Sequence, residues 1–302
     1  MKLAMVGLGR MGGNMARRLR RGGIEVAGWN RTWAVTEALA RETGLEPAAS
    51  LEELVGRLAR PRVVWLMLPA GAPTEETLDR LAGLLEPGDV VVDGGNADYR
   101  DSQRRARELG ARGLLFVDVG VSGGVWGLEN GYCLMAGGEA EAVALLEPAL
   151  RVLAPAPDRG WAHVGPSGAG HFVKMVHNGV EYGMMQALAE GLALLRAKEE
   201  LGIDLAQVAE LWRHGSVVRS WLLDLTAGFL AEDQRLADVA PVVPDSGEGR
   251  WTAREAIDLG VAAPVITLAL HMRFASQDGE GYANRLLAMM RKAFGGHRVV
   301  RT

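Results

Sequence analysis

Four polar side chains recur at helical spacing between Gly168 and Gly183, and their chemical types suit acid–base catalysis. At about 100° per residue, Lys174, His177, Asn178 and Glu181 fall on one face of a helix. Lys174 and Glu181 lie about 20° apart on this face after two turns. A neutral lysine can accept a proton, a glutamic acid can donate one, and the other two side chains can hold a substrate by hydrogen bonds.

The residues that flank this polar face are apolar, which favours a functional interpretation. The alternative is a solvated stripe that carries an ion pair seven residues apart. Buried polar groups need partners or a function, so we expect an active-site face with buried surroundings. The apolar neighbours are Phe172, Val173, Val176 and Met184.

Length and composition predict a cytoplasmic protein with two domains. The 302 residues exceed the usual size of a single domain. The longest apolar run, Val63 to Leu68, is far shorter than the roughly 20 residues of a membrane span. The chain enters a strand-like pattern directly at Met1, so no export signal is expected. The single cysteine, Cys133, lies in an apolar run, where we expect it in the core of a protein from a reducing compartment.

The charge pattern argues against nucleic acid as a partner. The chain carries 33 basic and 37 acidic residues, and its formal net charge is −4. A basic cluster from Arg17 to Arg21 lies at the end of the first predicted helix, where cations suit the helix dipole. We interpret this cluster as a solvated face.

The order of apolar patterns predicts an α/β fold, with a doubly wound Rossmann-type sheet followed by an all-α domain. Short apolar runs alternate with amphipathic segments in the first half, and Ala/Leu/Met-rich helical patterns replace them from Pro166 onward. Prolines and glycines near 154–166 indicate the boundary. We therefore expect a Rossmann-type α/β domain over residues 1–165 and an all-helical domain over residues 166–302. The predicted strands are Leu3 to Leu8, Ile24 to Trp29, Val63 to Leu68, Val90 to Asp93, Leu115 to Val119 and Tyr132 to Ala136.

A GxGxxG sequence follows the first predicted strand and opens a helix, as in dinucleotide-binding folds. Its glycines permit a tight turn and close approach to a pyrophosphate, and the helix N-terminus faces the anion. A tight turn without a ligand is the alternative. The candidate cofactor-binding residues are Gly7, Leu8, Gly9, Arg10, Met11, Gly12, Asn30, Arg31, Thr32, Leu68 and Asn96.

The end of the second predicted strand favours NADP over NAD. An NAD site usually has an acidic residue here for the ribose 2′-hydroxyl, whereas this chain has Arg31 followed by Thr32. A guanidinium and a hydroxyl can bind a 2′-phosphate. The alternative is a surface arginine next to a helix-capping threonine.

Two further turns are expected at the edge of the sheet that binds ligands. Asp93-Gly-Gly-Asn96 follows one strand, and Ser122-Gly123-Gly124 follows another. Asn96, Ser122 and the backbone N–H groups of these turns could bind a hydroxyl or carboxylate of a substrate. Each turn alone is equally typical of an ordinary chain reversal.

With these motifs, the chain resembles 6-phosphogluconate dehydrogenase, in its short form that lacks a long C-terminal extension. The resemblance extends over essentially all residues. The pair His177-Asn178 and Glu181 point to this decarboxylating branch within the β-hydroxyacid dehydrogenases. The most specific matches are the segment from Gly168 to Tyr182, Asp93 to Asn96, Val121 to Gly124 and Gly247 to Thr252.

The resemblance implies a reaction without a metal. Lys174 would take the proton of the C3 hydroxyl of 6-phosphogluconate while hydride passes to the nicotinamide, and cationic Lys174 would then stabilise the enolate formed by loss of CO₂. Glu181 would protonate C1 of the enediol and give ribulose 5-phosphate. The residues implied to hold carboxylate and hydroxyls are His177, Asn178, Asn96, Ser122, Gly123 and Gly124.

The resemblance also implies a phosphate site and self-association. Arg250, Arg273 and the hydroxyl of Tyr182 would bind the phosphate. Arg291 and His297 match residues that reach the active site of a neighbouring subunit, in a homodimer or homotetramer; an ordinary helix end is the alternative for them. Arg250 stands where long forms have lysine, and Val125-Trp126 follows Gly124 where they have an acidic run, which matches the short form.

Two rival functions remain open. A non-decarboxylating β-hydroxyacid dehydrogenase, such as one for 3-hydroxyisobutyrate, would need neither Arg250 and Arg273 nor Glu181. A nucleotide-sensing protein without turnover would not need an intact Lys174.

Overall fold

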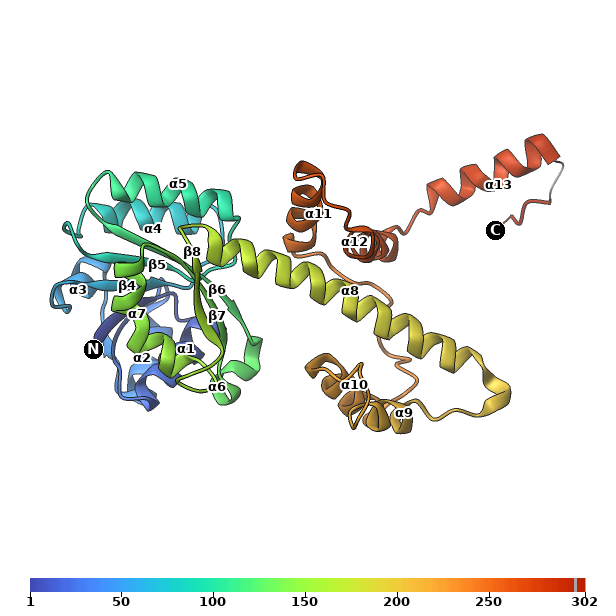
Figure 1. Cartoon of the computed structure of the whole chain (residues 1–302), viewed down its shortest axis with the longest axis horizontal. Helices are drawn as coiled ribbons and strands as arrows, with labels where there is room; N and C mark the ends of the chain where they lie inside the picture. Colours follow the sequence, from blue (N-terminus) through green and yellow to red (C-terminus); the bar gives the residue numbers. More distant parts are fainter. Residues whose placement is uncertain (296–297, 302) are drawn as a thin grey trace. The chain divides into compact units, whose positions relative to one another are not determined.

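The computed structural model describes residues 1–295 and 298–301, and the chain forms two compact units, residues 1–177 and 178–302. The first unit is built on one sheet, and the second contains helices (Figure 1). The long helix α8 (Ala169–Ala197) begins in the first unit and continues into the second. The domain division predicted at residues 165 and 166 lies just before this helix and stays a prediction.

Eight strands form the sheet of the first unit in the order β3-β2-β1-β4-β5-β6-β7-β8. The first six run parallel, β7 is antiparallel to β6, and β8 is parallel to β7. In a sheet of order 3-2-1-4-5-6, ligands bind beyond the carboxyl ends of the strands where the order reverses, here between β1 and β4. The strands are β1 (Lys2–Val6), β2 (Glu25–Trp29), β3 (Glu46–Pro47), β4 (Val63–Leu66), β5 (Val90–Asp93), β6 (Leu115–Ser122), β7 (Cys133–Gly138) and β8 (Trp161–Gly165).

Helices cover both faces of the sheet, because alternate strand residues point to opposite sides. Leu3 and Met5 pack with the core of α1 (Arg10–Arg21), α2 (Trp33–Thr43) and α7 (Ala140–Leu153). Ala4 and Val6 pack on the opposite face, in a second apolar core with residues of α3 (Leu51–Gly56), α4 (Ala72–Ala82) and α5 (Tyr99–Gly110). The sheet between two helical layers is visible in Figure 1 and confirms the predicted α/β class.

Several short elements were not expected from the sequence. The strands β3 and β8 have two and five residues, and helix α3 has six. Two residues in β3 and six in α3 are too few to show a clear hydrophobic period. The residues of β8 are exposed or only partly buried, so no apolar run marks this strand. The connection from β6 to β7 also contains a 3₁₀ turn, η1 (Gly124–Trp126), and the short helix α6 (Gly127–Asn130).

The second unit has two small apolar clusters along α8. Leu188 and Leu192 of α8 pack with α9 (Leu205–Trp212) and α10 (Trp221–Glu232). Nearer the start of the helix, Tyr182 packs with α11 (Glu248–Asp258) and α12 (Pro264–Gln277). The remaining elements are η2 (Glu199–Leu201) and α13 (Tyr282–Gly295). Among the described residues, no helix combines the length and the apolarity that a membrane crossing requires.

Candidate active site

The glycine turn after β1 has the geometry that close approach to a nucleotide requires. Gly7 has φ +88°, and a Cβ built there would lie 2.5 Å from the carbonyl oxygen of Met67. A Cβ on Gly12 would overlap the carbonyl oxygen of Gly7, so the first turn of α1 packs directly on the loop. Gly9 is the N-cap of α1, and both Gly9 and Arg10, the first residue of the helix, are exposed. This turn fits a dinucleotide pyrophosphate at the helix N-terminus.

The end of β2 is tied to the same turn. The side-chain oxygen of Asn30 accepts a hydrogen bond of 3.1 Å from the backbone N–H of Leu8. The side-chain NH₂ group of Asn30 donates a hydrogen bond of 3.3 Å to the carbonyl of Thr32. Arg31 and Thr32 are exposed next to it. Asn30 thus links the end of β2 to the glycine turn after β1, and the role of Arg31 and Thr32 in cofactor choice stays a prediction. Thr32 is the N-cap residue of α2, but its side chain makes no capping bond.

The turns after β4 and β5 lie against each other. A Cβ on Gly95 would come within 2.6 Å of the carbonyl oxygen of Leu68, and a Cβ on Gly7 would lie 2.9 Å from the Leu68 side chain. Gly94 donates its N–H to the carbonyl of Leu66 at 2.9 Å. Asn96 follows as an exposed residue. The structure thus brings the predicted residues Gly7, Leu68 and Asn96 to one edge of the sheet.

Lys174 is held against the backbone of β6. A Cβ on Gly120 would overlap the Cβ of Lys174 and would lie 2.7 Å from the carbonyl oxygen of Gly170. Ser122 lies two residues beyond Gly120, so both face the same side of the strand. The predicted base therefore lies on the face of the sheet that also carries the predicted substrate residue Ser122.

A buried carboxylate fixes the start of α8 on this face. Asp118 of β6 accepts hydrogen bonds from the backbone N–H groups of Gly168, at 2.6 Å, and His171, at 2.8 Å. The ring Nδ1 of buried His171 lies 2.7 Å from the hydroxyl of Ser102 on α5. Burial raises the pKa of the Asp118 carboxyl, although the charge of His171 and these backbone hydrogen bonds oppose the shift. The acceptors on Asp118 satisfy N–H groups that a helix start leaves without intrahelical partners.

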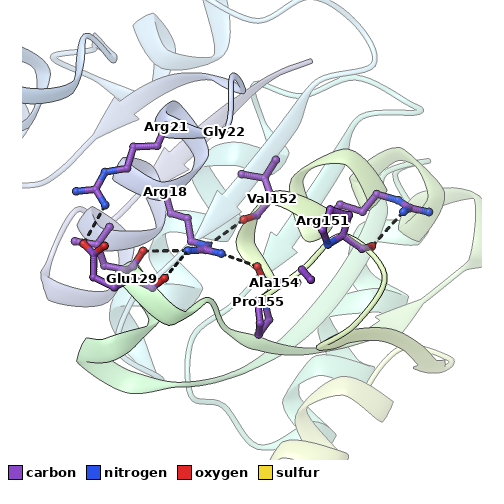
Figure 2. A pocket seen from close by; sticks show the side chains of 11 residues that line it. Arg18, Arg21, Gly22, Glu129, Arg151, Val152, Ala154 and Pro155 are labelled. Carbon is purple, nitrogen blue, oxygen red and sulfur yellow. Dashed lines mark hydrogen bonds and ion pairs between the residues drawn. The ribbon is translucent and has the colours of Figure 1, made fainter.

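Arg18 holds the loop that follows Ser122. Gly123 has φ +128° and turns the chain away from β6. The guanidinium of Arg18 donates to the carbonyls of Leu128, at 3.1 Å, and Ala154, at 2.7 Å (Figure 2). It also donates to the carbonyls of Glu129, Val152 and Leu153.

The neighbouring arginines of this cluster are also paired within the chain. Arg17 bonds Glu42, and Arg21 bonds Glu129. Interpreting the cluster as a solvated face was therefore wrong for Arg18, because loop carbonyls from distant segments surround it. The surface pocket in Figure 2 is lined by Arg18, Arg21 and Arg151, whose charges already have partners in the chain.

Cys133 is exposed, so its expected place in the core was wrong. It is the first residue of β7 and lies opposite Ser122, at the end of the strand where the buried pattern has not yet begun. Partial desolvation raises the pKa of its thiol, and the positive charge of Lys174 acts in the opposite direction. Lys174, which packs against Gly120, and the paired residues Ser122 and Cys133 thus lie near one another in the first unit.

The polar face of α8 is confirmed as helical over its whole length, since one helix contains Lys174, His177, Asn178 and Glu181. All four side chains are partly exposed. The expectation of buried surroundings was wrong for two neighbours, because Val173 is 36% and Met184 is 42% exposed. A long helix that packs with one side leaves apolar residues on its other side exposed.

The predicted phosphate-binding residues gather in the second unit. Arg273 stacks on the ring of Tyr182, with its guanidinium carbon 3.4 Å from the ring centre, and donates to the carbonyl of Pro244 at 3.0 Å. The Tyr182 hydroxyl lies 3.2 Å from that of Ser246. Arg250 pairs with Asp245. The loop from Pro244 to Gly247 thus joins three predicted residues that come from α8, α11 and α12.

The two predicted tail residues are placed differently. Arg291 lies on α13 with an exposed side chain. His297 lies outside the described residues. Their role at the site of a neighbouring subunit stays a prediction.

Sequence reasoning missed the residues that support this site. Asp118 and Arg105 are charged but almost completely buried, at 0% and 1% exposure. A signal for Asp118 was present, because it is the one charged residue within the apolar strand β6. Arg105 gave no such signal, since it stands among other charged residues of a surface helix pattern.

Comparison with known proteins agrees with this architecture. Residues 2–165 match the NAD binding domain of 6-phosphogluconate dehydrogenase, and residues 170–300 match the C-terminal domain of the same enzyme. An NAD(+)-dependent, decarboxylating 6-phosphogluconate dehydrogenase of Haloferax volcanii is 43% identical over 100% of this chain and 99% of its own. An NADP(+)-dependent, decarboxylating enzyme of Bacillus subtilis is 37% identical over 91% of this chain and 61% of its own.

A solved structure gives the same result. The 6-phosphogluconate dehydrogenase of Plasmodium falciparum superimposes with a TM-score of 0.86 at 28% identity, over 100% of this chain and 66% of the other. The chain therefore spans almost all of the Haloferax relative and about two thirds of the longer ones. With both of its family models and a full-length relative in agreement, this chain belongs to the 6-phosphogluconate dehydrogenase family.

Proposed function

We propose that this chain is a cytoplasmic enzyme that converts 6-phospho-D-gluconate to D-ribulose 5-phosphate and CO₂ while it reduces NADP or NAD. The observation that carries the proposal is the placement of Lys174 against Gly120, beside Ser122 and on the same helix as His177, Asn178 and Glu181. The family membership supports the choice of substrate. When bound, the nicotinamide accepts the hydride from C3 of the substrate.

Lys174 serves first as a base and then, as a cation, stabilises negative charge. In its neutral form it takes the proton of the C3 hydroxyl, and as a cation it then stabilises the negative charge on the C3 oxygen during decarboxylation. Its backbone cannot move toward β6, because Gly120 and Gly170 are already in contact there. This fixed origin favours catalysis, since positioning of a catalytic group lowers the barrier.

Glu181 lies two turns after Lys174 on α8 and donates a proton to C1 of the enediol. His177 and Asn178 lie between them on the same face and bind substrate hydroxyls and the carboxylate. Asn96, Ser122 and the N–H groups of Gly123 and Gly124 add donors at the carboxyl edge of the sheet.

The phosphate is assigned to Tyr182, Arg250 and Arg273. The two guanidinium groups offer forked donors that match phosphate oxygens. In the present arrangement Asp245 binds Arg250, so a phosphate must compete with this carboxylate. We assign the completion of the site to Arg291 and His297 of a neighbouring copy in a homodimer or homotetramer.

The turn after β1 holds the cofactor, and Arg31 with Thr32 favours NADP. We assign Gly7, Leu8, Gly9, Arg10, Met11 and Gly12 to the pyrophosphate. Leu68, whose side chain would contact a Cβ on Gly7, is assigned to the same site. Relatives named for each of the two cofactors occur in the family.

A substrate screen with both cofactors tests the proposal. Purified protein should reduce NADP or NAD with 6-phosphogluconate and release an equal amount of CO₂, as measured by nicotinamide absorbance and CO₂ trapping. Reduction without CO₂, or turnover of 3-hydroxyisobutyrate instead, would assign the chain to the non-decarboxylating dehydrogenases. Binding of a nucleotide with no turnover of either acid would leave only a sensor function.

The role of Lys174 has its own test. Lys174→Met should lower kcat by about 10²- to 10⁴-fold, the usual contribution of a general acid–base group. Lys198→Met removes an exposed lysine just beyond the end of α8 and should leave kcat unchanged.

A further inference from the structure

An ion pair lies inside the first unit, between the sheet and helix α5. Arg105 of α5 and Asp93 at the end of β5 are each 1% exposed, and Nη1 lies 2.7 Å from Oδ2. Replacing a buried ion pair by apolar residues is often neutral or stabilising, because desolvation offsets the attraction. Stability alone therefore gives little reason for a charged pair at this point, and its contacts with the surrounding loops are more informative.

The second oxygen of Asp93 shapes the turn that carries Asn96. Oδ1 accepts a hydrogen bond of 3.0 Å from the backbone N–H of Gly95. The turn is pressed against the end of β4, where a Cβ on Gly95 would come within 2.6 Å of the carbonyl oxygen of Leu68. A rotation of the Asp93 carboxylate would therefore release Gly95 and shift Asn96.

Arg105 also binds the neighbouring loop. Its Nη2 and Nε donate to Oε1 of Glu75, at 2.6 and 3.1 Å, in the first turn of α4. Next to Glu75, the hydroxyl of Thr74 donates a hydrogen bond of 2.8 Å to the carbonyl of Pro69, in the loop between β4 and α4 that contains Leu68. Burial raises the pKa of Glu75, but hydrogen bonds from Arg105 and Arg104 outweigh this effect and hold its pKa below the usual range. Glu75 is thus ionised at neutral pH and is available to Arg105.

One guanidinium therefore connects the loops that follow two adjacent parallel strands, β4 and β5. We propose that Arg105 is a positioning residue, which acts through Asp93 and Glu75 to hold the Leu68 loop and the Asn96 turn in their binding geometry. This role rests on the proposed function, because Leu68 and Asn96 are its assigned cofactor and substrate contacts. Arg105 itself is buried and touches neither ligand.

The test compares variants that differ in charge and in shape. Arg105→Met removes the connection, and Arg105→Lys keeps the charge but cannot bind two carboxylates with a planar fork. Arg107→Met, on the exposed side of the same helix, is the matched control. Misplacement of binding groups by about 1 Å can lower activity by about 10²-fold. We expect Arg105→Met to raise the NADP Kd, measured by calorimetry, and the KM for 6-phosphogluconate by about 10-fold or more.

Arg105→Lys should recover part of both losses, and Arg107→Met should match the wild type. Amide hydrogen exchange at Gly95 and Asn96 gives a readout without ligand, and we expect it to be faster in Arg105→Met while exchange in β1 is unchanged. Wild-type Kd, KM and exchange rates in folded Arg105→Met would overturn the proposal. The proposal would also be overturned if NADP binding and activity in Arg105→Met decreased only in proportion to the fraction of folded protein.

Arg105→Met leaves a buried carboxylate without its cation and can fail to fold. The double variant Arg105→Met with Asp93→Asn removes this unpaired charge but keeps an acceptor for Gly95. If the double variant folds with wild-type NADP affinity and wild-type exchange at Gly95, Arg105 has no positioning role. If the wild type binds NADP but does not turn over 6-phosphogluconate, the proposed function fails, while Kd and exchange still decide the role of Arg105.

Discussion

The Cβ of Lys174 rests on the backbone of Gly120, so closely that any side chain at position 120 would overlap it. Two residues of this family member, 54 positions apart in the chain, thereby set the distance between helix α8 and strand β6. The contact makes a small change at position 120 a direct test of how much the placement of Lys174 matters.

Gly120→Ala adds one methyl group against Lys174 and Gly170. We expect the helix start to shift, kcat with 6-phosphogluconate to fall by about 10²-fold, and the free energy of unfolding to fall by about 1–3 kcal/mol. Steady-state kinetics and urea denaturation measure the two effects. Gly56→Ala is the control, because a Cβ there meets nothing within 4 Å. It should leave kcat unchanged and should not lower the free energy of unfolding, since alanine favours a helix more than glycine does. Normal kcat in Gly120→Ala would mean that α8 adjusts without loss of geometry.

Cys133 reports the charge of Lys174 without any need for turnover. Partial desolvation raises the pKa of its thiol and Lys174 lowers it, so Lys174→Met should raise the thiol pKa further. The thiolate is the reactive form of this single cysteine. At pH 8, and at any pH below the pKa of the thiol, iodoacetamide should therefore alkylate the cysteine more slowly in the variant than in the wild type. Mass spectrometry of timed samples measures the rate. Equal rates in wild type and variant would contradict the placement of the ammonium group near the thiol.

Asp118 should make stability depend on pH with a defined sign. Its pKa is raised in the folded state, so its favourable contribution is complete below the unfolded pKa of about 3.9 and is lost as the pH rises through the folded pKa. Asp118→Asn cannot ionise, although its single carbonyl cannot replace both oxygens that bind Gly168 and His171. The difference in the free energy of unfolding between Asp118→Asn and wild type should therefore be most unfavourable to the variant in acid. As the pH rises toward 7, this difference should shift in favour of the variant, by about 1.4 kcal/mol for each pH unit by which folding raises the pKa of Asp118. Urea denaturation between about pH 4 and pH 7 measures this difference. If folding did not raise the pKa of Asp118, the free energies of unfolding of wild type and variant would change in parallel with pH.

Arg31 should control cofactor choice. Replacing it by aspartate removes a donor for a 2′-phosphate and adds repulsion, while a carboxylate can accept the ribose 2′-hydroxyl of NAD. We expect kcat/KM for NADP to fall by about 10²-fold and the value for NAD to rise or hold. Arg41→Gln, on helix α2 that follows, should leave the ratio of the two values unchanged. An unchanged ratio in Arg31→Asp would place the 2′-group elsewhere.

The parts of the molecule that could be predicted from sequence are those with local signals. The turn from Gly7 to Gly12 and the helix that carries Lys174 and Glu181 depend on residues close together in the chain, and both are present. The supporting contacts depend on residues far apart, such as Asp118 with His171 and Arg18 with Ala154. Such pairs leave no periodic pattern, because tertiary packing alone decides which distant atoms meet. Cys133 shows the same limit, since an apolar run does not reveal where a strand leaves the covered part of the sheet.

Gly120, Gly137 and Gly170 have a joint consequence for the motion of the site. At these positions main-chain atoms of β6, β7 and the first turn of α8 are in direct contact, so no rotatable side chain lies between them. Changes of rotamer among the surrounding core side chains therefore do not displace the Cα and Cβ atoms of Lys174. The remaining freedom of the amine is confined to the torsions of the lysine itself, which a bound substrate can restrict one by one.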